Sequence, residues 1–437
     1  MADLQQWLDK IEHRNGAIKL GLEQVKRSAR ALSLTKPAPV VITVAGTNGK
    51  GSVCRLLDQL FTSHGFKIGC YTSPHLVHFN ERITINSQPV SDEQIIESFE
   101  YLEQTLKNDA IKLTFFEFST LAAWHLFAHS NLDILILEIG LGGRLDAVNT
   151  IPKDLAIITS IDLDHQNILG NNIEMIGYEK AGIISENLTV ILGDVDMPSS
   201  VLDIANAKTD IEKIYHYQKN FYLEVDQLNY KFIIPRADVE LNIKMSKHFN
   251  IRPNNVATAL MALNVISQKF NKTCFNKDII NNVFDNFRFI GRCSWLDEEQ
   301  TLLLDVAHNQ QSIENLAKHI NEIKKNTGKK ITAICGMLAD KDIKNSLKSI
   351  QTLIDDWHLI TLDTSRGEKA EELANILNSL NTNVKYTLHD NIINSFEFVN
   401  NFMTQKFNNN HILVIFGSFY TVGPIYQYIS TLKVTNK

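Results

Sequence analysis

The sequence GTNGKGS at residues 46–52 follows the apolar run 39–45 and precedes a helical pattern that begins near Val53. This order predicts a buried strand, a glycine-rich turn and the start of a helix. Backbone N–H groups in such a turn can surround an oxyanion, the helix N-terminus adds positive potential, and Lys50 can neutralise a terminal phosphate. A glycine-rich turn alone is more often only a turn. The strand, lysine, hydroxyl and helix together favour a nucleotide site.

The loop departs from the usual P-loop pattern, in which the lysine directly precedes a serine or threonine. Gly51 separates Lys50 from Ser52, and Val44 stands where that pattern has its first glycine. The loop is therefore predicted to bind phosphate although it does not follow the usual pattern.

Length and composition indicate an enzyme of more than one domain. The 437 residues are too many for one compact core, and 44% of them are hydrophobic, which allows a large buried interior. The net charge of −6 and the pI near 6.2 give no basic surface for nucleic acid, which is not expected as a partner.

The N-terminal residues 1–10 are polar and helix-like, and no apolar run approaches the length of a membrane span. No membrane association is expected, and the cytoplasm is the expected compartment. The cysteines lie far apart without a Cys-x-x-Cys pair, so they are predicted to be reduced core residues; they are Cys54, Cys70, Cys274, Cys293 and Cys335.

Strand-like apolar runs alternate with amphipathic helices, which predicts an α/β fold with a mainly parallel sheet. The first series of runs covers residues 40–45, 67–72, 134–138, 155–161 and 188–193. Residues 215–243 suggest antiparallel strands, and 254–270 read as a helix. A second series has strands near 302–306, 331–335, 358–362 and 412–416. The boundary is expected within 286–292, giving domains 1–288 and 289–437.

A carboxylate follows one of the buried strands. Glu138 ends an apolar run and precedes a glycine-rich segment at 140–146. Ligands in parallel sheets gather at the carboxyl ends of strands, and Mg²⁺ prefers oxygen donors. Glu138 and Ser52 are therefore candidate magnesium ligands. The alternative is a strand-end glutamate that faces solvent.

Two further segments, 160–165 and 178–183, follow in the same series. His165 comes after a buried strand, so a metal role is plausible, although a lone histidine is usually structural. Lys180 lies in a helical pattern and by itself reads as a surface lysine.

These segments together resemble the folylpolyglutamate synthase family of the Mur ligase superfamily, and more closely its bifunctional dihydrofolate synthase/folylpolyglutamate synthase branch. The resemblance covers nearly the whole chain. The matching segments are VAGTNGKGS (44–52), TSPHL (72–76), EIGLGGRLD (138–146), DH (164–165), EKAGI (179–183), DVAHN (305–309), GMLADKD (336–342) and GSF (417–419).

The resemblance implies a P-loop-containing, mainly parallel sheet domain of the Mur ligase central type, followed by a smaller Rossmann-like domain. It implies a ligase that uses ATP and Mg²⁺, with two ions expected, to join L-glutamate to dihydropteroate and to reduced folates. A substrate carboxylate takes the γ-phosphoryl group of ATP, and the glutamate amine then displaces phosphate from the acyl phosphate. A monomer is expected, and a monovalent cation requirement is left open.

Site residues follow from the same resemblance. The catalytic set is Lys50, Glu138, His165, Lys180 and His308. The ATP-binding set is Gly46, Thr47, Asn48, Gly49, Lys50, Gly51, Ser52, Asn255, Arg292 and Asp305. The metal ligands are Ser52, Ser73, Glu138, His165 and Lys180, the last in a carbamylated form. Without the resemblance, Asn255 reads as a helix cap, Arg292 as a linker residue, Asp305 as a strand end and His308 as a helix cap.

Substrate-binding positions are implied in the same way. They are Leu20, Gly21, Leu22, Ser73, Pro74, His75, Arg82, Thr114, Phe116, Asp146 and Ser418. Phe116 and Asp146 suit a flat, donor-rich pterin by stacking and hydrogen bonding. By themselves they read as a core aromatic and a turn residue, and Ser73 as a turn residue before Pro74.

The chain departs from the family pattern at two positions. Gln310 stands where relatives often have proline, and Tyr178 where they often have arginine. Neither position removes a proposed ligand. Alternatives are a monofunctional folylpolyglutamate synthase, another Mur-type amide ligase, or, in a different class, a protein that binds ATP as a switch without ligation.

Overall fold

The computed structural model describes residues 3–13, 21–226, 229–246, 249–270, 275–406 and 410–435. The chain divides into two compact units. The first comprises Met1–Asp162 with Gln166–Phe287, and the second comprises Leu163–His165 with Arg288–Lys437. The chain therefore enters the second unit for a short segment, returns to the first, and enters the second again after Phe287.

The first unit is built on an eight-stranded sheet in the order β4-β3-β2-β5-β1-β6-β7-β8. The strands from β2 to β8 in this order run parallel, and β3 and β4 form an antiparallel edge. This confirms the predicted mainly parallel sheet. The strands are β1 (Val40–Ala45), β2 (Ile68–Tyr71), β3 (Ile83–Ile85), β4 (Gln88–Pro89), β5 (Ile134–Glu138), β6 (Leu155–Ile158), β7 (Thr189–Leu192) and β8 (Ile214–His216).

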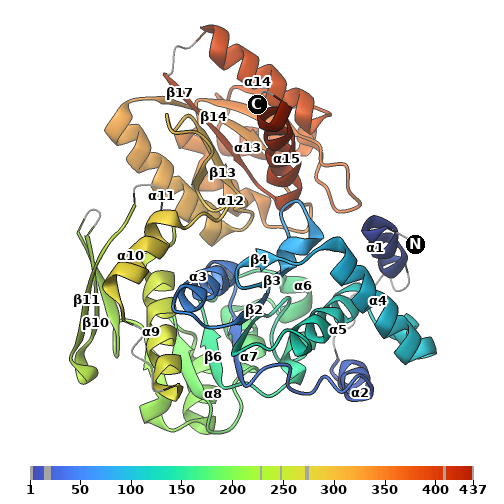
Figure 1. The fold of residues 1–437 in the computed structure, drawn as a ribbon. Coiled ribbons are helices and arrows are strands. Elements are labelled where there is room, and N and C mark those ends of the chain that lie inside the picture. Colours follow the sequence, from blue (N-terminus) through green and yellow to red (C-terminus); the bar gives the residue numbers. More distant parts are fainter. Residues whose placement is uncertain are drawn as a thin grey trace. The chain divides into compact units, whose positions relative to one another are not determined.

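Helices cover both faces of this sheet (Figure 1). Alternate side chains of a strand point to opposite faces. Val41 and Ala45 of β1 belong to a hydrophobic core that also contains side chains of α4, α5, α7 and α8. Helices α3 and α9 pack on the sheet and against each other. The helices are α1 (Leu4–Glu12), α2 (Glu23–Ala31), α3 (Lys50–Ser63), α4 (Asp92–Leu106), α5 (Phe115–Ala128), α6 (Gln166–Leu169), α7 (Ile173–Ala181), α8 (Ser199–Lys208), α9 (Pro253–Lys269) and α10 (Lys277–Asn286).

A separate three-stranded antiparallel sheet follows β8, in the order β11-β10-β9. Its strands are β9 (Tyr222–Asp226), β10 (Asn229–Ile234) and β11 (Val239–Lys244). The antiparallel prediction is therefore confirmed for these strands. It is wrong at the start of the stretch, because β8 pairs in parallel with β7 and extends the main sheet.

The second unit contains a six-stranded sheet in the order β12-β13-β17-β14-β15-β16. All neighbouring pairs are parallel except β12 with β13. The strands are β12 (Ser294–Trp295), β13 (Leu302–Asp305), β14 (Lys330–Cys335), β15 (Asp356–Ile360), β16 (Tyr386–His389) and β17 (His411–Phe416). The helices are α11 (Gln310–Thr327), α12 (Ile343–Lys348), α13 (Ala370–Leu380), α14 (Ile392–Lys406) and α15 (Phe419–Thr435).

Strand β16 was absent from the predicted strands. Three of its four residues are exposed at the sheet edge, and its sequence YTLH lacks the continuous apolar run of the central strands. An edge strand with little burial gives a weak sequence signal.

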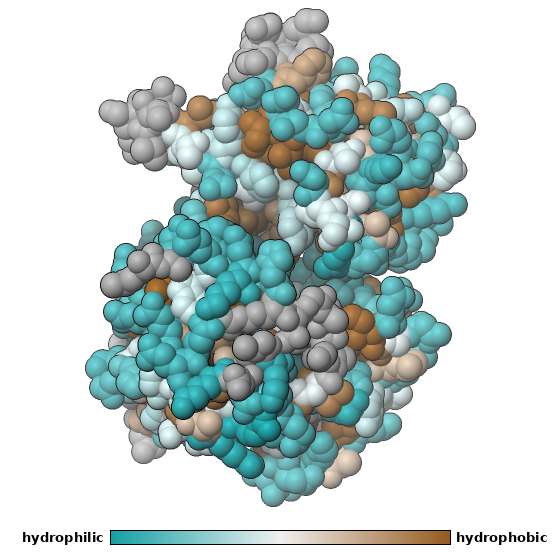
Figure 2. Space-filling view, turned by 90° about the vertical axis from the view of Figure 1, so that its right-hand side faces the viewer, coloured by the Kyte–Doolittle hydropathy of each residue, from teal (hydrophilic) through white to brown (hydrophobic). Residues whose placement is uncertain are grey.

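Most large hydrophobic side chains of the described residues are buried. On the face drawn in Figure 2, hydrophilic side chains predominate. Within the described residues, no helix combines the length and apolar character needed to cross a membrane.

Candidate functional site

The predicted phosphate loop lies between β1 and α3 and is attached to the end of β6. The Thr47 backbone N–H donates to the Ser160 carbonyl at 2.7 Å. The Thr47 hydroxyl donates to the Asp162 carbonyl at 3.0 Å and also accepts the Asp162 backbone N–H at 3.0 Å. Helix α3 begins at Lys50, earlier than the expected start near Val53, so Lys50, Gly51 and Ser52 form its first turn. This places the helix N-terminus directly at the loop.

Two glycines of the loop cannot be replaced without a clash. Gly46 has φ of +145°, and a Cβ there would lie 1.8 Å from Thr159 Oγ1. Gly49 has φ of +90°, and a Cβ there would lie 2.6 Å from Asn255 Nδ2. Both backbones therefore need glycine for conformation and for space.

Two lysines point at the same carbonyl of the loop. Lys50 Nζ donates to the Gly46 carbonyl at 3.0 Å and to the Thr47 carbonyl at 3.1 Å. Lys180 Nζ donates to the Gly46 carbonyl at 2.8 Å. Lys180 is only 5% exposed, so the interpretation as a surface lysine is wrong. Helix α7 packs this side chain against the phosphate loop.

Glu138 ends β5, which lies between β2 and β1 in the sheet. It is 4% exposed and accepts the backbone N–H of Ser73 at 3.2 Å, so it does not face solvent. Ser52 is also buried in the first turn of α3. Because β2, β5 and β1 are adjacent, Ser73, Glu138 and the phosphate loop all lie at the carboxyl ends of neighbouring parallel strands. Ligand sites are expected at this end of a parallel sheet.

The predicted metal ligands come from both units of the chain. Among the described residues, no group of three or more histidine, cysteine, aspartate or glutamate side chains is arranged to hold a metal ion. Four of the five predicted ligands, Ser52, Ser73, Glu138 and Lys180, belong to the first unit, and His165 belongs to the second. His165 has φ of +51°, a left-handed conformation that is uncommon outside glycine.

Asn255 does not cap helix α9, so that interpretation is wrong. Arg252 occupies the N-cap position, and Asn255 is the third residue of the helix. Its buried amide lies against Gly49 instead. Asn255 is therefore part of the wall of the phosphate loop.

Asp146 and Phe116 lie at the loop that follows β5. Asp146 is buried, and its carboxylate accepts N–H groups from Leu141 at 2.8 Å and Val148 at 2.9 Å. Burial nevertheless raises the pKa of Asp146 to about 6. The Phe116 ring is half-buried and so close to Gly140 that a Cβ there would lie 2.5 Å from the ring. Both residues are thus held firmly at one loop.

Thr114 is the N-cap of α5, where its hydroxyl accepts the Glu117 N–H at 3.3 Å. Gly21 and Leu22 directly precede α2, which packs against α5 and against the short 3₁₀ helix η3 (Ala147–Thr150) after Asp146. Leu20 lies outside the described residues. The helix packing therefore brings this N-terminal segment toward the elements that carry Phe116 and Asp146.

An arginine–histidine pair lies beyond β2. Arg82 Nε donates to His75 Nδ1 at 2.8 Å, and the guanidinium lies over the rings of Phe79 and Phe115 at 5.4 and 5.5 Å. Burial, with the Arg82 charge, lowers the pKa of His75 to about 4, so the imidazole is neutral near pH 7. The preceding Ser73–Pro74 peptide bond is cis.

In the second unit, Asp305 ends β13 and is buried. Its carboxylate accepts the backbone N–H of Cys293 at 2.8 Å and lies 3.1 Å from the Cys293 sulfur. Burial raises the pKa of Asp305, and the Arg292 guanidinium opposes this shift. The prediction of core cysteines holds for Cys54, Cys70 and Cys335, whereas Cys293 is half-buried at this site and Cys274 lies outside the described residues.

Arg292 and His308 lie near the Phe419 ring, and Ser418 directly precedes Phe419. The Arg292 guanidinium lies 5.4 Å from the ring centroid, and the His308 ring centroid lies 6.4 Å from it. Ser418 is buried and directly precedes α15. Because β13 pairs with β17 and Asp305 faces Phe416, the loops after these strands are neighbours.

The orientation of His308 is set by the backbone. Its Nδ1 lies 2.8 Å from the Val306 carbonyl, and a carbonyl only accepts, so Nδ1 carries the proton. Burial, with the Lys341 charge, lowers the pKa of His308 to about 4. His308 is not the cap of α11, since Asn309 holds that position.

Sequence reasoning assigned no role to Asp164 or Lys341. Their side chains meet at 2.7 Å. Burial raises the pKa of Asp164, but the Lys341 ammonium, His165 and His308 outweigh it and hold the pKa well below its usual range. The residues are 177 positions apart, so spacing gave no signal of the pair.

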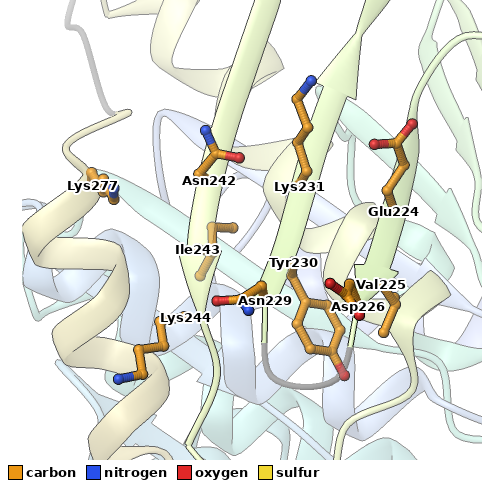
Figure 3. A pocket seen from close by; sticks show the side chains of 10 residues that line it. All are labelled: Glu224, Val225, Asp226, Asn229, Tyr230, Lys231, Asn242, Ile243, Lys244 and Lys277. Carbon is orange, nitrogen blue, oxygen red and sulfur yellow. The ribbon is translucent and has the colours of Figure 1, made fainter.

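One cavity lies apart from all predicted site residues. It has a volume of about 520 Å³ and lies on the antiparallel sheet β9–β11, where the Tyr230 ring lies beside Val225, Asp226 and Asn229 (Figure 3). Its lining residues come from these strands and from Lys277. We assign it no part in the site described above.

The fold and these contacts agree with two known families. Residues 44–263 match the Mur ligase middle domain, and residues 293–428 match the C-terminal domain of dihydrofolate synthetase. The dihydrofolate synthase/folylpolyglutamate synthase of Haemophilus influenzae is 34% identical over 449 aligned positions, covering 98% of this chain and 97% of that protein. The protein of the same name from Escherichia coli is 37% identical over 371 positions, covering 85% and 84%.

Solved structures give the same result. Escherichia coli FolC in complex with DHPP and ADP is 33% identical, with a TM-score of 0.88 over 99% of both chains. A bifunctional folylpolyglutamate synthase/dihydrofolate synthase with Mn, AMPPNP and L-glutamate bound is 33% identical, with a TM-score of 0.86 over 98% of both chains. This chain belongs to the dihydrofolate synthase/folylpolyglutamate synthase family of Mur ligases.

Proposed function

We propose that this chain is the ligase that its family membership indicates, adding L-glutamate to dihydropteroate and to reduced folates at the expense of ATP. The observation that carries the proposal is the arrangement of side chains at the carboxyl ends of the strands in the first sheet. There, Lys50 and Lys180 donate to a glycine loop whose backbone tolerates no side chain at its first position, and Glu138 ends the neighbouring strand. Relatives hold ADP with DHPP, or an ATP analogue with Mn and L-glutamate, which supports this assignment.

The reaction requires two displacements. An oxygen of the folate or pteroate carboxylate attacks the γ-phosphorus of ATP, the bond to the β-phosphate oxygen breaks, and ADP leaves. The glutamate amine then attacks the acyl carbon, phosphate leaves with the bonding electron pair, and the amine loses a proton. Positioning and charge neutralisation serve such transfers better than covalent help from the protein.

Residues of the first unit, together with His165 of the second, serve the phosphoryl transfer. In the proposed site, the loop residues 46–52 hold the ATP phosphates, with Lys50 moving from the loop carbonyls to the phosphate oxygens, and Asn255 stands beside them. Ser52, Ser73, Glu138, His165 and a carbamylated Lys180 would hold Mg²⁺, a set rich in the oxygen donors that this ion prefers. When bound, Mg²⁺ neutralises charge on the transferred group.

Residues of the second unit serve ATP and glutamate. We assign Arg292 to the ATP phosphates, Asp305 to the ribose hydroxyls, and His308 and Ser418 to the glutamate region. The neutral His308 presents Nε2 as an acceptor because Nδ1–H is held by Val306. In this assignment residues 1–288 form the phosphate loop and the folate site. Residues 289–437 add further contacts to ATP and bind glutamate.

The pterin side of the first unit receives the acceptor. Phe116 offers a ring face, and Asp146 offers a carboxylate at a loop lined by backbone N–H groups. The remaining assigned positions are Leu20, Gly21, Leu22, Pro74, His75, Arg82 and Thr114. We further propose a cytoplasmic monomer that engages neither nucleic acid nor membrane, and we leave a monovalent cation requirement open.

Release of ADP tests the proposal directly. Purified protein with ATP, Mg²⁺ and L-glutamate is expected to release ADP when either dihydropteroate or tetrahydrofolate is added, and mass spectrometry should show one added glutamate per ADP. Reaction with tetrahydrofolate alone would show a monofunctional folylpolyglutamate synthase. Nucleotide binding without product from either acceptor would show the switch-type protein instead.

The raised pKa of Asp146 predicts a pH dependence of acceptor binding. Below pH 6 the carboxyl is mostly protonated in the folded protein, and above it the carboxylate can accept N–H groups of the pterin. The KM for dihydropteroate should therefore fall about tenfold between pH 5 and pH 7. Asp146→Asn should remove the dependence, while the KM for ATP serves as internal control. A KM that is equally pH-dependent in this variant would contradict the assignment.

A further inference from the structure

We propose that Lys341 is a positioning residue that fixes the Asp164 carboxylate, and that this carboxylate holds the backbone of His165 in its left-handed conformation. The inference rests on the proposed function, in which His165 contacts the metal. Lys341 itself touches no substrate.

The ion pair is buried and short. Lys341 Nζ lies 2.7 Å from Asp164 Oδ1, and the two side chains are only 5% and 11% exposed. Taking two charges out of water is costly, and removing one partner leaves the other charge buried without compensation. The pair therefore strongly favours one placement of Asp164.

Asp164 passes this placement on to His165. Its Oδ1 also accepts the backbone N–H of His165 at 2.8 Å, which supports the left-handed conformation of that residue. Its Oδ2 lies 3.9 Å from His165 Nε2 and 3.9 Å from His308 Nε2, and Asn309 Nδ2 reaches it at 3.4 Å. One carboxylate thus accepts N–H groups from His165 and from Asn309, the N-cap of α11, whereas the acceptor Nε2 of neutral His308 is only a neighbour.

Lys341 has a rigid support. It lies in the loop between β14 and α12, where the Ala339 N–H donates to the Arg366 carbonyl at 2.9 Å and Arg366 pairs with Asp340 at 2.6 Å. Asp342, the next residue, caps α12. The loop is therefore fixed on both sides of the lysine.

Asp164 lies in a short chain segment that the ion pair attaches to the second unit. Leu163–His165 belongs to the second unit, although the chain on either side belongs to the first. Lys341 binds this short segment within the second unit. Without the ammonium, we expect Asp164 to seek water, and the left-handed backbone of His165 to lose its acceptor.

Lys341→Met tests the inference, with Lys344→Met on α12 as a matched control because Lys344 is exposed. Two readouts are measured: hydrogen exchange at the His165 backbone amide without ligands, and the kinetics of ADP release. Lys341→Met should speed exchange at His165 at least about tenfold and lower kcat/KM about 10- to 100-fold. Lys341→Arg keeps the positive charge and should retain most of the slow exchange at His165 and most of kcat/KM. Lys344→Met should change neither the exchange rate nor kcat/KM.

Unchanged exchange at His165 in Lys341→Met would overturn the inference, whether or not activity falls. If Lys341→Met does not fold, the double variant Lys341→Met with Asp164→Asn removes both charges and should fold with fast exchange at His165. Slow exchange in that double variant would also overturn it. Hydrogen exchange is measured without substrates. The exchange result therefore tests the role of Lys341 even if the wild-type protein shows no ligase activity.

Discussion

Lys50→Ala is expected to lower kcat for ligation by about 10²- to 10³-fold, the usual cost of removing one preorganised electrostatic group from a transition state. Lys50 is the first residue of α3, and in the proposed site its ammonium stays beside the transferred phosphoryl group. Its present partners, the Gly46 and Thr47 carbonyls, show that the ammonium is already held over the loop. Loss of these bonds should lower the free energy of unfolding by only about 1–3 kcal/mol.

Steady-state ADP release and thermal denaturation separate these two effects. Lys67→Ala is the matched control, since Lys67 is an exposed lysine of the same unit. It should keep both activity and stability. A Lys50→Ala protein that is folded and fully active would show that the loop does not act on the phosphates.

Much of the fold was predictable because its central strands are continuously apolar. Every residue of β1 and β5 is buried, and such runs indicate strands covered on both faces. The phosphate loop was predictable for a related reason, since glycines, a lysine and a helix start are local in sequence. Helix α3 nevertheless starts at Lys50 rather than near Val53, because the loop ends with Gly49 in a left-handed conformation that sequence pattern does not show.

Long-range contacts were not predictable from pattern. Asn255 looked like a helix cap, yet its amide lies against Gly49 because α9 packs on α3. The pairing of Asp164 with Lys341 depends on loops that meet only after the second unit has folded. Helical periodicity likewise placed Lys180 at the surface, whereas α7 buries it at the loop.

Lys180→Met is expected to lower kcat by at least about 10²-fold, because in the proposed site a carbamate on Lys180 supplies a metal ligand. The geometry favours the proposed modification. The ammonium groups of Lys50 and Lys180 both donate to the Gly46 carbonyl, so two like charges share one acceptor in a confined place. A carbamate forms when the neutral amine attacks CO₂ and a proton leaves, and it replaces the like-charge pair by an attractive one.

Carbon-13 NMR with labelled bicarbonate detects the carbamate independently of activity. Wild type should give a carbamate signal that Lys180→Met lacks, and wild-type activity should fall in CO₂-free buffer and return with bicarbonate. Lys153→Arg is the matched control, because Lys153 is half-buried and burial lowers its pKa to about 8, which makes it the competing amine. A signal that disappears in Lys153→Arg but persists in Lys180→Met would place the carbamate elsewhere. In that case, Lys180 would bind the loop as a cation, and the metal site would lack one of its proposed oxygen donors.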